Sequence, residues 1–163
     1  MFSKTTEYAL RAIIYLAKHS DINYKIGIAT VASAIDAPKS FTAKILQKLT
    51  KDNFPISSIP GPNGGLYMTM EGKNTTVLQV LELLNEDHVI NKCVLGLQEC
   101  NEETPCPMHA RYKLIKPLLQ DMFITKTLND LALELDHRIR LNNSILPLKT
   151  EKKRNKTPTK PEK

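Results

Sequence analysis

Residues 38–73 read PKSFTAKILQKLTKDNFPISSIPGPNGGLYMTMEGK, and this stretch decides the fold. Its first part carries apolar residues at the spacing of one helical face, and Pro38 suits the first turn of a helix. Its second part alternates weakly on both sides of PGPNGG, and Asn-Gly between two extended runs is a strong hairpin signal. The stretch therefore predicts a helix followed directly by a β-hairpin with a glycine-rich tip.

The residues before this stretch predict two more helices. Residues 5–18 form an amphipathic pattern with Thr5 or Thr6 as the cap, and residues 30–37 read as a short helix capped by Thr30. Two short helices, the second with basic and hydroxyl residues outside, followed by a hairpin, are typical of a winged helix-turn-helix that binds duplex DNA. The residues expected to contact DNA lie on that second helix or at the hairpin tip: Lys39, Ser40, Thr42, Lys44, Lys48, Gly61, Asn63, Gly64 and Gly65.

Charge divides the 163 residues into three parts. Residues 1–73 carry a net charge of +4, residues 74–148 carry −3 and residues 149–163 carry +5, which gives the total of +6. A basic first part suggests a polyanion as partner, and the basic end, residues 141–163, reads as a disordered tail. No run of about 18 apolar residues and no signal-peptide core occur, so we expect a cytoplasmic protein that does not enter a membrane.

The second half predicts a different region, residues 74–140, which holds a linker helix, a cysteine loop and dimerisation helices. A helix capped by Thr75 or Thr76 comes first, and a long helix starts near residue 108, where Pro117 should kink or interrupt it. A T-x-x-D capping pattern then starts a further helix at Thr127. Residues 114–123 are more apolar than one helix of a small domain needs, so a second copy of the chain is expected to cover them.

All three cysteines lie in the loop before the long helix. Cys93, Cys100 and Cys106 fall within fourteen residues, and His109 follows shortly after. An odd number of cysteines in a reducing compartment argues for metal binding or redox chemistry rather than for disulfides. Thiolates are soft ligands, and the sequence around them is too polar to be core, so iron–sulfur and zinc sites both remain open at this point.

Four stretches carry a family resemblance: TTEYALRAIIYLA at 5–17, KSFTAKILQKL at 39–49, GPNGGLYM at 61–68, and C-x6-C-x5-C-P-x-H at 93–109. In this order they resemble the IscR/NsrR (Rrf-two) family of winged-helix iron–sulfur transcriptional regulators. The resemblance covers residues 1–136. It implies a mainly α fold, with a winged helix-turn-helix in residues 1–73, a small β-hairpin wing and a long C-terminal dimerisation helix. It further implies a homodimer, expected to be a repressor, whose binding to double-stranded DNA responds to an iron–sulfur cluster.

The resemblance implies two ligand sets for that cluster. The favoured set is a two-iron cluster on the three cysteines and His109, and the alternative is a four-iron cluster whose fourth ligand is Glu7 of the partner chain. Two positions depart from the family pattern. Pro60 stands where family wings usually carry an arginine, and Ala43 stands where some relatives carry an acid. Phosphate contacts from the lysines of residues 39–48 are therefore expected to supply much of the affinity.

Two other functions compete with this hypothesis. One is a winged-helix regulator that is stabilised by zinc or responds to a small effector, without a redox cluster. The other is an iron–sulfur carrier without any DNA function, against which the basic first part of the chain counts. An enzyme is not expected, because no paired carboxylates, no phosphate-binding glycine loop before a helix and no nucleophile–base set stand out in the sequence.

Overall fold

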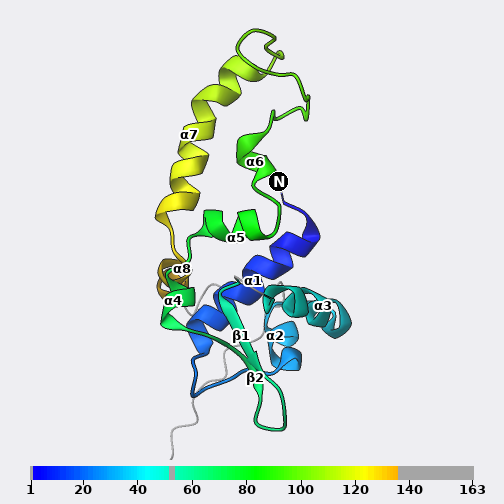
Figure 1. Ribbon diagram of the computed structural model, residues 1–163, viewed down its shortest axis with the longest axis vertical. Helices are drawn as coiled ribbons and strands as arrows, with labels where there is room; N and C mark the ends of the chain where they lie inside the picture. The colour runs from blue at the N-terminus through cyan, green and yellow to red at the C-terminus, as the bar shows by residue number, and fades with distance from the viewer. Residues whose placement is uncertain (1, 52–53, 136–163) are drawn as a thin grey trace, which may run out of the picture.

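The computed structural model describes residues 2–51 and 54–135 and shows a mainly helical chain with one two-stranded hairpin. This architecture confirms the predicted fold class. The first elements are α1 (Lys4–His19), α2 (Ile28–Ala34), α3 (Lys39–Leu49), β1 (Ile56–Ile59) and β2 (Gly65–Met68). The later elements are α4 (Met70–Lys73), α5 (Val77–Leu83), α6 (His88–Asn91), α7 (His109–Thr125) and α8 (Leu128–Glu134). We call residues 2–73 the head and residues 85–125 the arm, which projects away from the head in Figure 1.

Helix α1 begins with a serine cap. The Ser3 hydroxyl accepts a hydrogen bond from the backbone N–H of Thr6 across 3.2 Å. The prediction of Thr5 or Thr6 as the cap is therefore wrong. Thr6 instead lies inside the first turn with its side chain buried.

Helices α2 and α3 form the predicted helix-turn-helix. Helix α2 begins at Ile28 after Gly27, whose carbonyl accepts the N–H groups of Thr30 and Val31, so Thr30 lies inside the helix and does not cap it. Asp36, at φ 53°, makes the tight turn between the two helices. Pro38 then caps α3, and its fixed φ suits this position.

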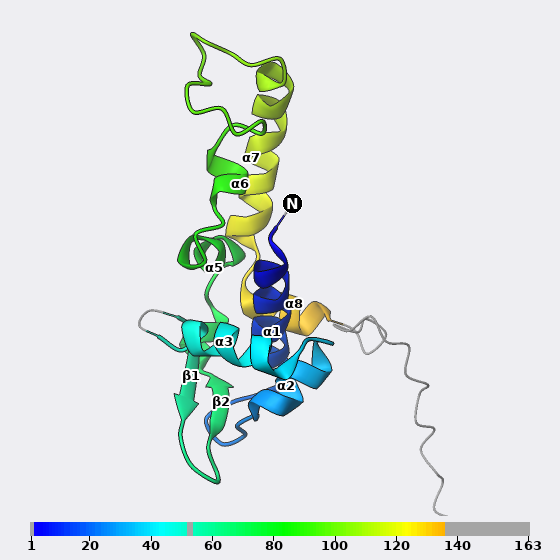
Figure 2. The same ribbon diagram turned by 90° about the vertical axis from the view of Figure 1, so that its right-hand side faces the viewer.

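Strands β1 and β2 pair antiparallel, from Ile56 opposite Met68 to Ile59 opposite Gly65. Figure 2 shows this hairpin, the wing, projecting beyond α2 and α3. The Gly64 N–H donates to the Gly61 carbonyl across 3.0 Å, so Pro62 and Asn63 form the centre of the turn. The predicted hairpin is therefore present, and Pro62 suits the first central position of its turn, because proline fixes the φ that this position requires.

The core of the head draws on residues from the end of the described chain. Ile13, Leu16 and Leu46 are buried together with Val80 and with Leu128 of α8. Helix α8 packs along α1, and the Lys18 ammonium donates to the Leu135 carbonyl beside it. The boundary expected after residue 73 therefore does not coincide with an edge of this core.

A second, smaller core joins α5, α6 and α7. It consists of Val77, Leu81, Ile90 and Phe123, and Phe2 packs against it with its ring centroid 6.0 Å from that of Phe123. Helix α7 runs unbroken past Pro117, so the expected interruption does not occur. This second core fixes the base of the arm to the start of α1.

Two capping boxes hold the segments that enter and leave the arm. Thr76 forms one with Gln79, and Thr127 forms the predicted one with Asp130. The two threonines also lie opposite each other in an isolated antiparallel bridge. Among the helices that the structure describes, none is long and apolar enough to cross a membrane. The predicted tail, residues 141–163, lies outside the described residues.

Candidate metal centre and nucleic-acid interface

The three cysteines meet at the far end of the arm, in the loop between α6 and α7 (Figure 1). Their sulfur atoms all lie within 4.8 Å of one another, and the Cys93 and Cys106 Sγ atoms are 3.6 Å apart. Cys106 is buried, whereas Cys93 and Cys100 are half-buried. The backbone N–H of His109 donates to the Cys106 carbonyl across 3.0 Å, which fixes this cysteine against the start of α7.

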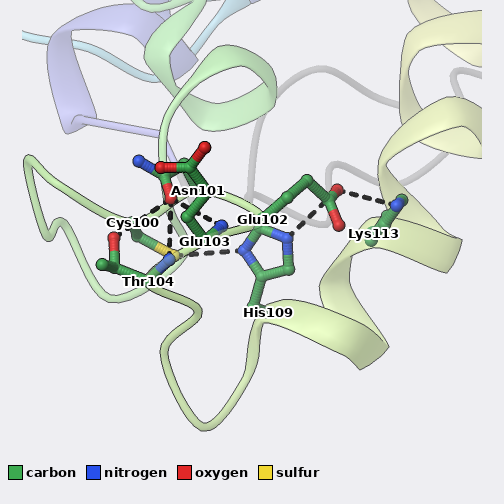
Figure 3. A network of polar contacts seen from close by, with 7 residues as sticks. All are labelled: Cys100, Asn101, Glu102, Glu103, Thr104, His109 and Lys113. Carbon is green, nitrogen blue, oxygen red and sulfur yellow. Dashed lines mark hydrogen bonds and ion pairs between the residues drawn. The ribbon is translucent and has the colours of Figure 1, made fainter.

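His109, the first residue of α7, faces Cys100 on one side and a carboxylate on the other (Figure 3). Its Nδ1 lies 3.2 Å from the Cys100 Sγ, and its Nε2 lies 3.5 Å from the Glu102 Oε1. The Lys113 Nζ donates to the same carboxylate oxygen across 2.7 Å. Hydrogen bonds first from Lys113 and then from His109 hold the pKa of Glu102 below its ordinary value.

The backbone of the loop influences the pKa values of the Cys93 and Cys100 thiols. Backbone N–H groups, that of Leu95 most strongly, outweigh desolvation and lower the pKa of Cys93 to about 7. For Cys100, the backbone of Cys106 lowers the pKa, but desolvation and the two neighbouring thiols outweigh it and raise the pKa above 9.0. The sulfurs therefore differ in how readily they become thiolates, the form that binds metals.

The donor set fits a metal that prefers sulfur. A cavity of about 170 Å³ is lined by the three cysteines and His109, together with Lys92, Lys113 and Lys116. Thiolate and imidazole donors suit zinc and iron–sulfur clusters, and lysines around them would offset the negative charge of the thiolates. Within the described residues, the group of donor atoms within 4.8 Å contains the three sulfurs but not His109.

Glu7, the alternative fourth ligand, lies in the first turn of α1 and outside this group. Its carboxylate accepts a 2.7 Å hydrogen bond from the Lys4 ammonium, which lowers its pKa. The alternative required Glu7 of a partner chain, so a single chain does not test it, and it stays a prediction.

The outer face of α3 carries most of the residues predicted to contact DNA. Lys39, Ser40, Lys44 and Lys48 are exposed. Thr42 is not: its side chain is 1% exposed, and its hydroxyl donates to the Pro38 carbonyl across 3.0 Å. Thr42, which was predicted to contact DNA, therefore does not present its side chain on the outer face, because it lies three positions before the buried Ile45 and shares its face.

Gln47 is exposed on the same outer face and was missed. Ser40, Lys44 and Gln47 recur at helical spacing, which is the signal that could have identified it. Glutamine can form two hydrogen bonds to an adenine edge in the major groove, and the exposed Gln47 amide offers both a donor and an acceptor beside the lysines.

The wing tip exposes Pro60, Gly61 and Asn63, while Gly64 and Gly65 are half-buried. The Gly64 N–H donates to the Gly61 carbonyl, so this N–H is not free to bind a phosphate. A Cβ at Gly64 would lie 2.1 Å from the Ile59 carbonyl oxygen. This glycine is therefore required by the close approach of the backbone within the turn.

Helix α7 exposes an apolar surface, as predicted, but the surface is smaller. Leu114 and Leu118 are 74% and 71% exposed, and Ile115 and Met122 are also exposed. Phe123, which was expected to be part of this surface, is 7% exposed and packs inside the chain. Because the Phe123 ring packs against Phe2 of the same chain, no second copy of the chain is needed to cover it.

Comparisons with known proteins identify the family of the chain. Residues 2–134 match the sequence family described as "Rrf2: Iron-dependent Transcriptional regulator". A putative HTH-type transcriptional regulator of Aquifex aeolicus is 32% identical over 133 residues, which cover 80% of this chain and 90% of that protein. The HTH-type transcriptional regulator IscR of Vibrio cholerae is 24% identical over 127 residues, 78% and 72% of the two chains.

A solved structure shares the fold. CymR, the global cysteine regulator of B. subtilis, superposes with a TM-score of 0.67 at 19% identity, over 83% of this chain and 98% of that chain.

Proposed function

Because this chain belongs to the Rrf2 family of transcriptional regulators, we propose that it is a homodimeric repressor whose operator binding responds to an iron–sulfur cluster in the arm. The family consists of regulators and not of enzymes, which agrees with the absence of an enzyme-like motif in the sequence. It also counts against an iron–sulfur carrier without DNA function. A regulator of transcription acts where the DNA is, so the proposal places the protein in the cytoplasm.

The observation that carries the proposal is the convergence of three cysteine sulfurs within 4.8 Å beside His109. Two close contacts divide the four donors into pairs, Cys93 with Cys106 at 3.6 Å and Cys100 with His109 at 3.2 Å. Each iron of a two-iron cluster takes two protein donors, and the three cysteines with His109 supply the four donors that such a cluster needs. The three sulfurs also lie close enough together to bind a single zinc ion, so a zinc-stabilised regulator is the second candidate, and metal analysis separates the two.

A bound cluster would supply a centre that changes charge or is lost when it meets an oxidant or a reactive gas. The residues of this chain would hold it at the far end of the arm. Backbone N–H groups on Cys93 would favour the thiolate form that a cluster requires, and Lys92 and Lys116 of the cavity would offset its negative charge, since Lys113 is paired with Glu102.

Helix α1 connects the arm to the DNA-reading helix. Its start packs against the arm, where Phe2 lies against Phe123. Tyr8, in the second turn of α1, packs edge-on against Phe41 of α3, with ring centroids 5.8 Å apart. A shift of the cysteine loop would therefore reach α3 through α7 and α1. Coupling of about 1–3 kcal/mol between the two sites is enough for a regulatory response.

The DNA-binding part of the proposal rests on α3, the wing and the dimer. Lys39, Lys44 and Lys48 would contact phosphates, while Ser40 and Gln47 face the same side for base edges. Pro60 brings no charge to the wing, so the wing would contribute through its shape rather than through attraction to phosphate. A dimer formed on the apolar surface of α7 would present two copies of α3 to two half-sites.

The test is a comparison of DNA binding with and without the cluster. A duplex is selected by the anaerobic, cluster-loaded protein from a random library, and its dissociation constant is then measured for the loaded and the cluster-free protein. The proposal predicts a difference of at least about tenfold, equivalent to about 1.4 kcal/mol. The Cys106→Ala variant should behave like the cluster-free protein. Equal dissociation constants for loaded and cluster-free protein would leave a DNA-binding regulator and remove the cluster response.

A further inference from the structure

We propose that Glu102, backed by Lys113, is a positioning residue that holds the His109 ring with its Nδ1 turned toward Cys100 and the metal. The inference rests on the proposed function, because it concerns how one ligand of the cluster is oriented. Neither residue stands out in the sequence, since Glu102 is one of several acids in a polar loop and Lys113 is one of several basic residues on α7.

The geometry assigns opposite tasks to the two ring nitrogens. Nε2 lies 3.5 Å from the Glu102 Oε1, and Nδ1 lies 3.2 Å from the Cys100 Sγ (Figure 3). An ionised carboxylate only accepts hydrogen bonds, so the hydrogen shared with Glu102 belongs to Nε2. In a neutral imidazole the other nitrogen then carries the free lone pair, so Nδ1 is the nitrogen that can bind a metal.

Lys113 holds the carboxylate in place. It lies one helical turn after His109 on α7, so the two side chains share a face of the helix. Its Nζ lies 2.7 Å from the same Oε1 that faces His109. The Glu102 side chain is 70% exposed, so the Lys113 ammonium is the partner that keeps this carboxylate over the ring.

The backbone of the loop delivers Glu102 to this place. Asn101 closes a tight turn, in which its Oδ1 accepts the N–H groups of Glu103 and Thr104, each across 2.8 Å. The Thr104 hydroxyl donates back to the Glu99 carbonyl and closes the loop further. The turn therefore holds residue 102 between the thiols and the first turn of α7.

Carboxylate–histidine–metal arrangements of this kind fix the ring and tune its strength as a ligand, and the loss of the outer partner usually costs about 10- to 100-fold in metal affinity. Because Glu102 is largely exposed, we expect the lower end of that range. The rate of cluster loss to a chelator under anaerobic conditions should rise about tenfold in Glu102→Ala. Glu102→Gln should recover much of the loss, because its amide oxygen still accepts from Nε2, and Lys113→Ala should give a smaller increase.

Glu103→Ala is the matched control, because it removes the same charge from the next residue and keeps the backbone N–H that donates to Asn101. Its rate of cluster loss should equal that of the unaltered protein. A second readout reports the ring itself. Protein labelled with ¹⁵N-histidine should show the magnetic signature of one nitrogen bound to the reduced cluster, and this signal should weaken or split in Glu102→Ala. A purely structural role of Glu102 would leave the signal unchanged, and that result would overturn the proposal.

The double variant separates this inference from the proposed function. In a His109→Ala background, Glu102→Ala should have no further effect on cluster loss, because it acts through His109. The positioning role would be overturned if Glu102→Ala raised the rate of cluster loss equally with and without His109. It would also be overturned if Glu102→Ala and Glu103→Ala lost the cluster at the same rate. If the chain takes zinc in place of the cluster, the proposed function fails, and the same variants are compared by the rate of zinc release. A His109→Ala variant that holds its cluster unchanged would reject the positioning role and leave the cluster itself standing.

Discussion

The Thr6 hydroxyl donates a 2.8 Å hydrogen bond to the Glu86 carboxylate, which lies 80 positions later in the chain. Thr6 belongs to the first turn of α1, and Glu86 lies at the start of the arm, between α5 and α6. Hydrogen bonds from Ser3 and then from Thr6 hold the pKa of Glu86 below its ordinary value of 4.5, so the carboxylate is charged near neutral pH. This contact and the Phe2–Phe123 pair join the head to the arm at the same end of α1.

Loss of the Thr6 hydroxyl should destabilise the protein. Valine has nearly the same shape, so Thr6→Val removes the donor to Glu86 together with the 3.0 Å contact to the Ser3 hydroxyl and leaves the packing almost unchanged. We expect the free energy of unfolding in urea to fall by about 1.5–3 kcal/mol, as for a hydrogen bond to a charged acceptor. Thr5→Val, at an exposed position next to it, is the control and should be close to neutral. Equal losses in the two variants would show that the contact adds nothing.

The Cys93 thiol should titrate well below an ordinary cysteine in the metal-free protein. Its pKa is lowered to about 7, so the thiolate is the minor form below that pH and the main form above it. The alkylation rate of Cys93 by iodoacetamide, followed by peptide mass spectrometry, should rise with a midpoint near pH 7. Alkylation of Cys100, whose pKa is raised, should rise only at higher pH. A common midpoint above 8 for both cysteines would contradict the effect of the loop N–H groups.

The sequence predicted the helix-turn-helix, the wing and the cysteine loop because each depends on local patterns. The apolar stripe of α3 and the glycine-rich tip are such patterns, and the structure contains both elements. Thr127 and Asp130 form the predicted capping box, since both partners lie within one turn. The first residues of α1 and α2 were not predicted. Ser3 and Gly27 occupy the N-cap positions, and serine, glycine and threonine are all common at such positions, so residue type alone does not choose among them.

What depended on tertiary contacts was not predictable. Thr42 looked like an outward hydroxyl, but the face of α3 that meets α1 extends far enough to bury it. Phe123 looked like part of a dimer surface, and only the folded chain brings Phe2 to it. The group around His109 was invisible for the same reason, because Glu102 reaches the ring across a loop whose shape the Asn101 turn determines.

The lysines of α3 should set the salt dependence of DNA binding. If Lys44 and Lys48 each contact a phosphate, the slope of log affinity against log salt should become shallower by about 0.9 for each alanine substitution and by about 1.8 for both. Arg111→Ala is the control, because Arg111 is exposed on α7 and outside the head. An unchanged slope in the double variant would remove these lysines from the interface.

A charge on the apolar surface of α7 should break the dimer. Leu118 is 71% exposed in the single chain, so Leu118→Glu should leave the fold intact and prevent a second copy from covering the surface. Light scattering at micromolar concentration should give about twice 18.4 kDa for the unaltered protein and about 18.4 kDa for the variant. Leu133→Glu, at a leucine 76% exposed on α8, is the matched control and should stay dimeric. An unaltered protein that is monomeric both alone and on DNA would contradict the half-site arrangement.

The most direct measurement of the central claim is the metal content of anaerobically purified protein, with its visible absorption. The account predicts coloured protein with about two iron and about two sulfide per chain, and colourless protein when Cys93, Cys100 or Cys106 is replaced by alanine. Colourless protein that carries about one zinc per chain would contradict the cluster and the response that depends on it.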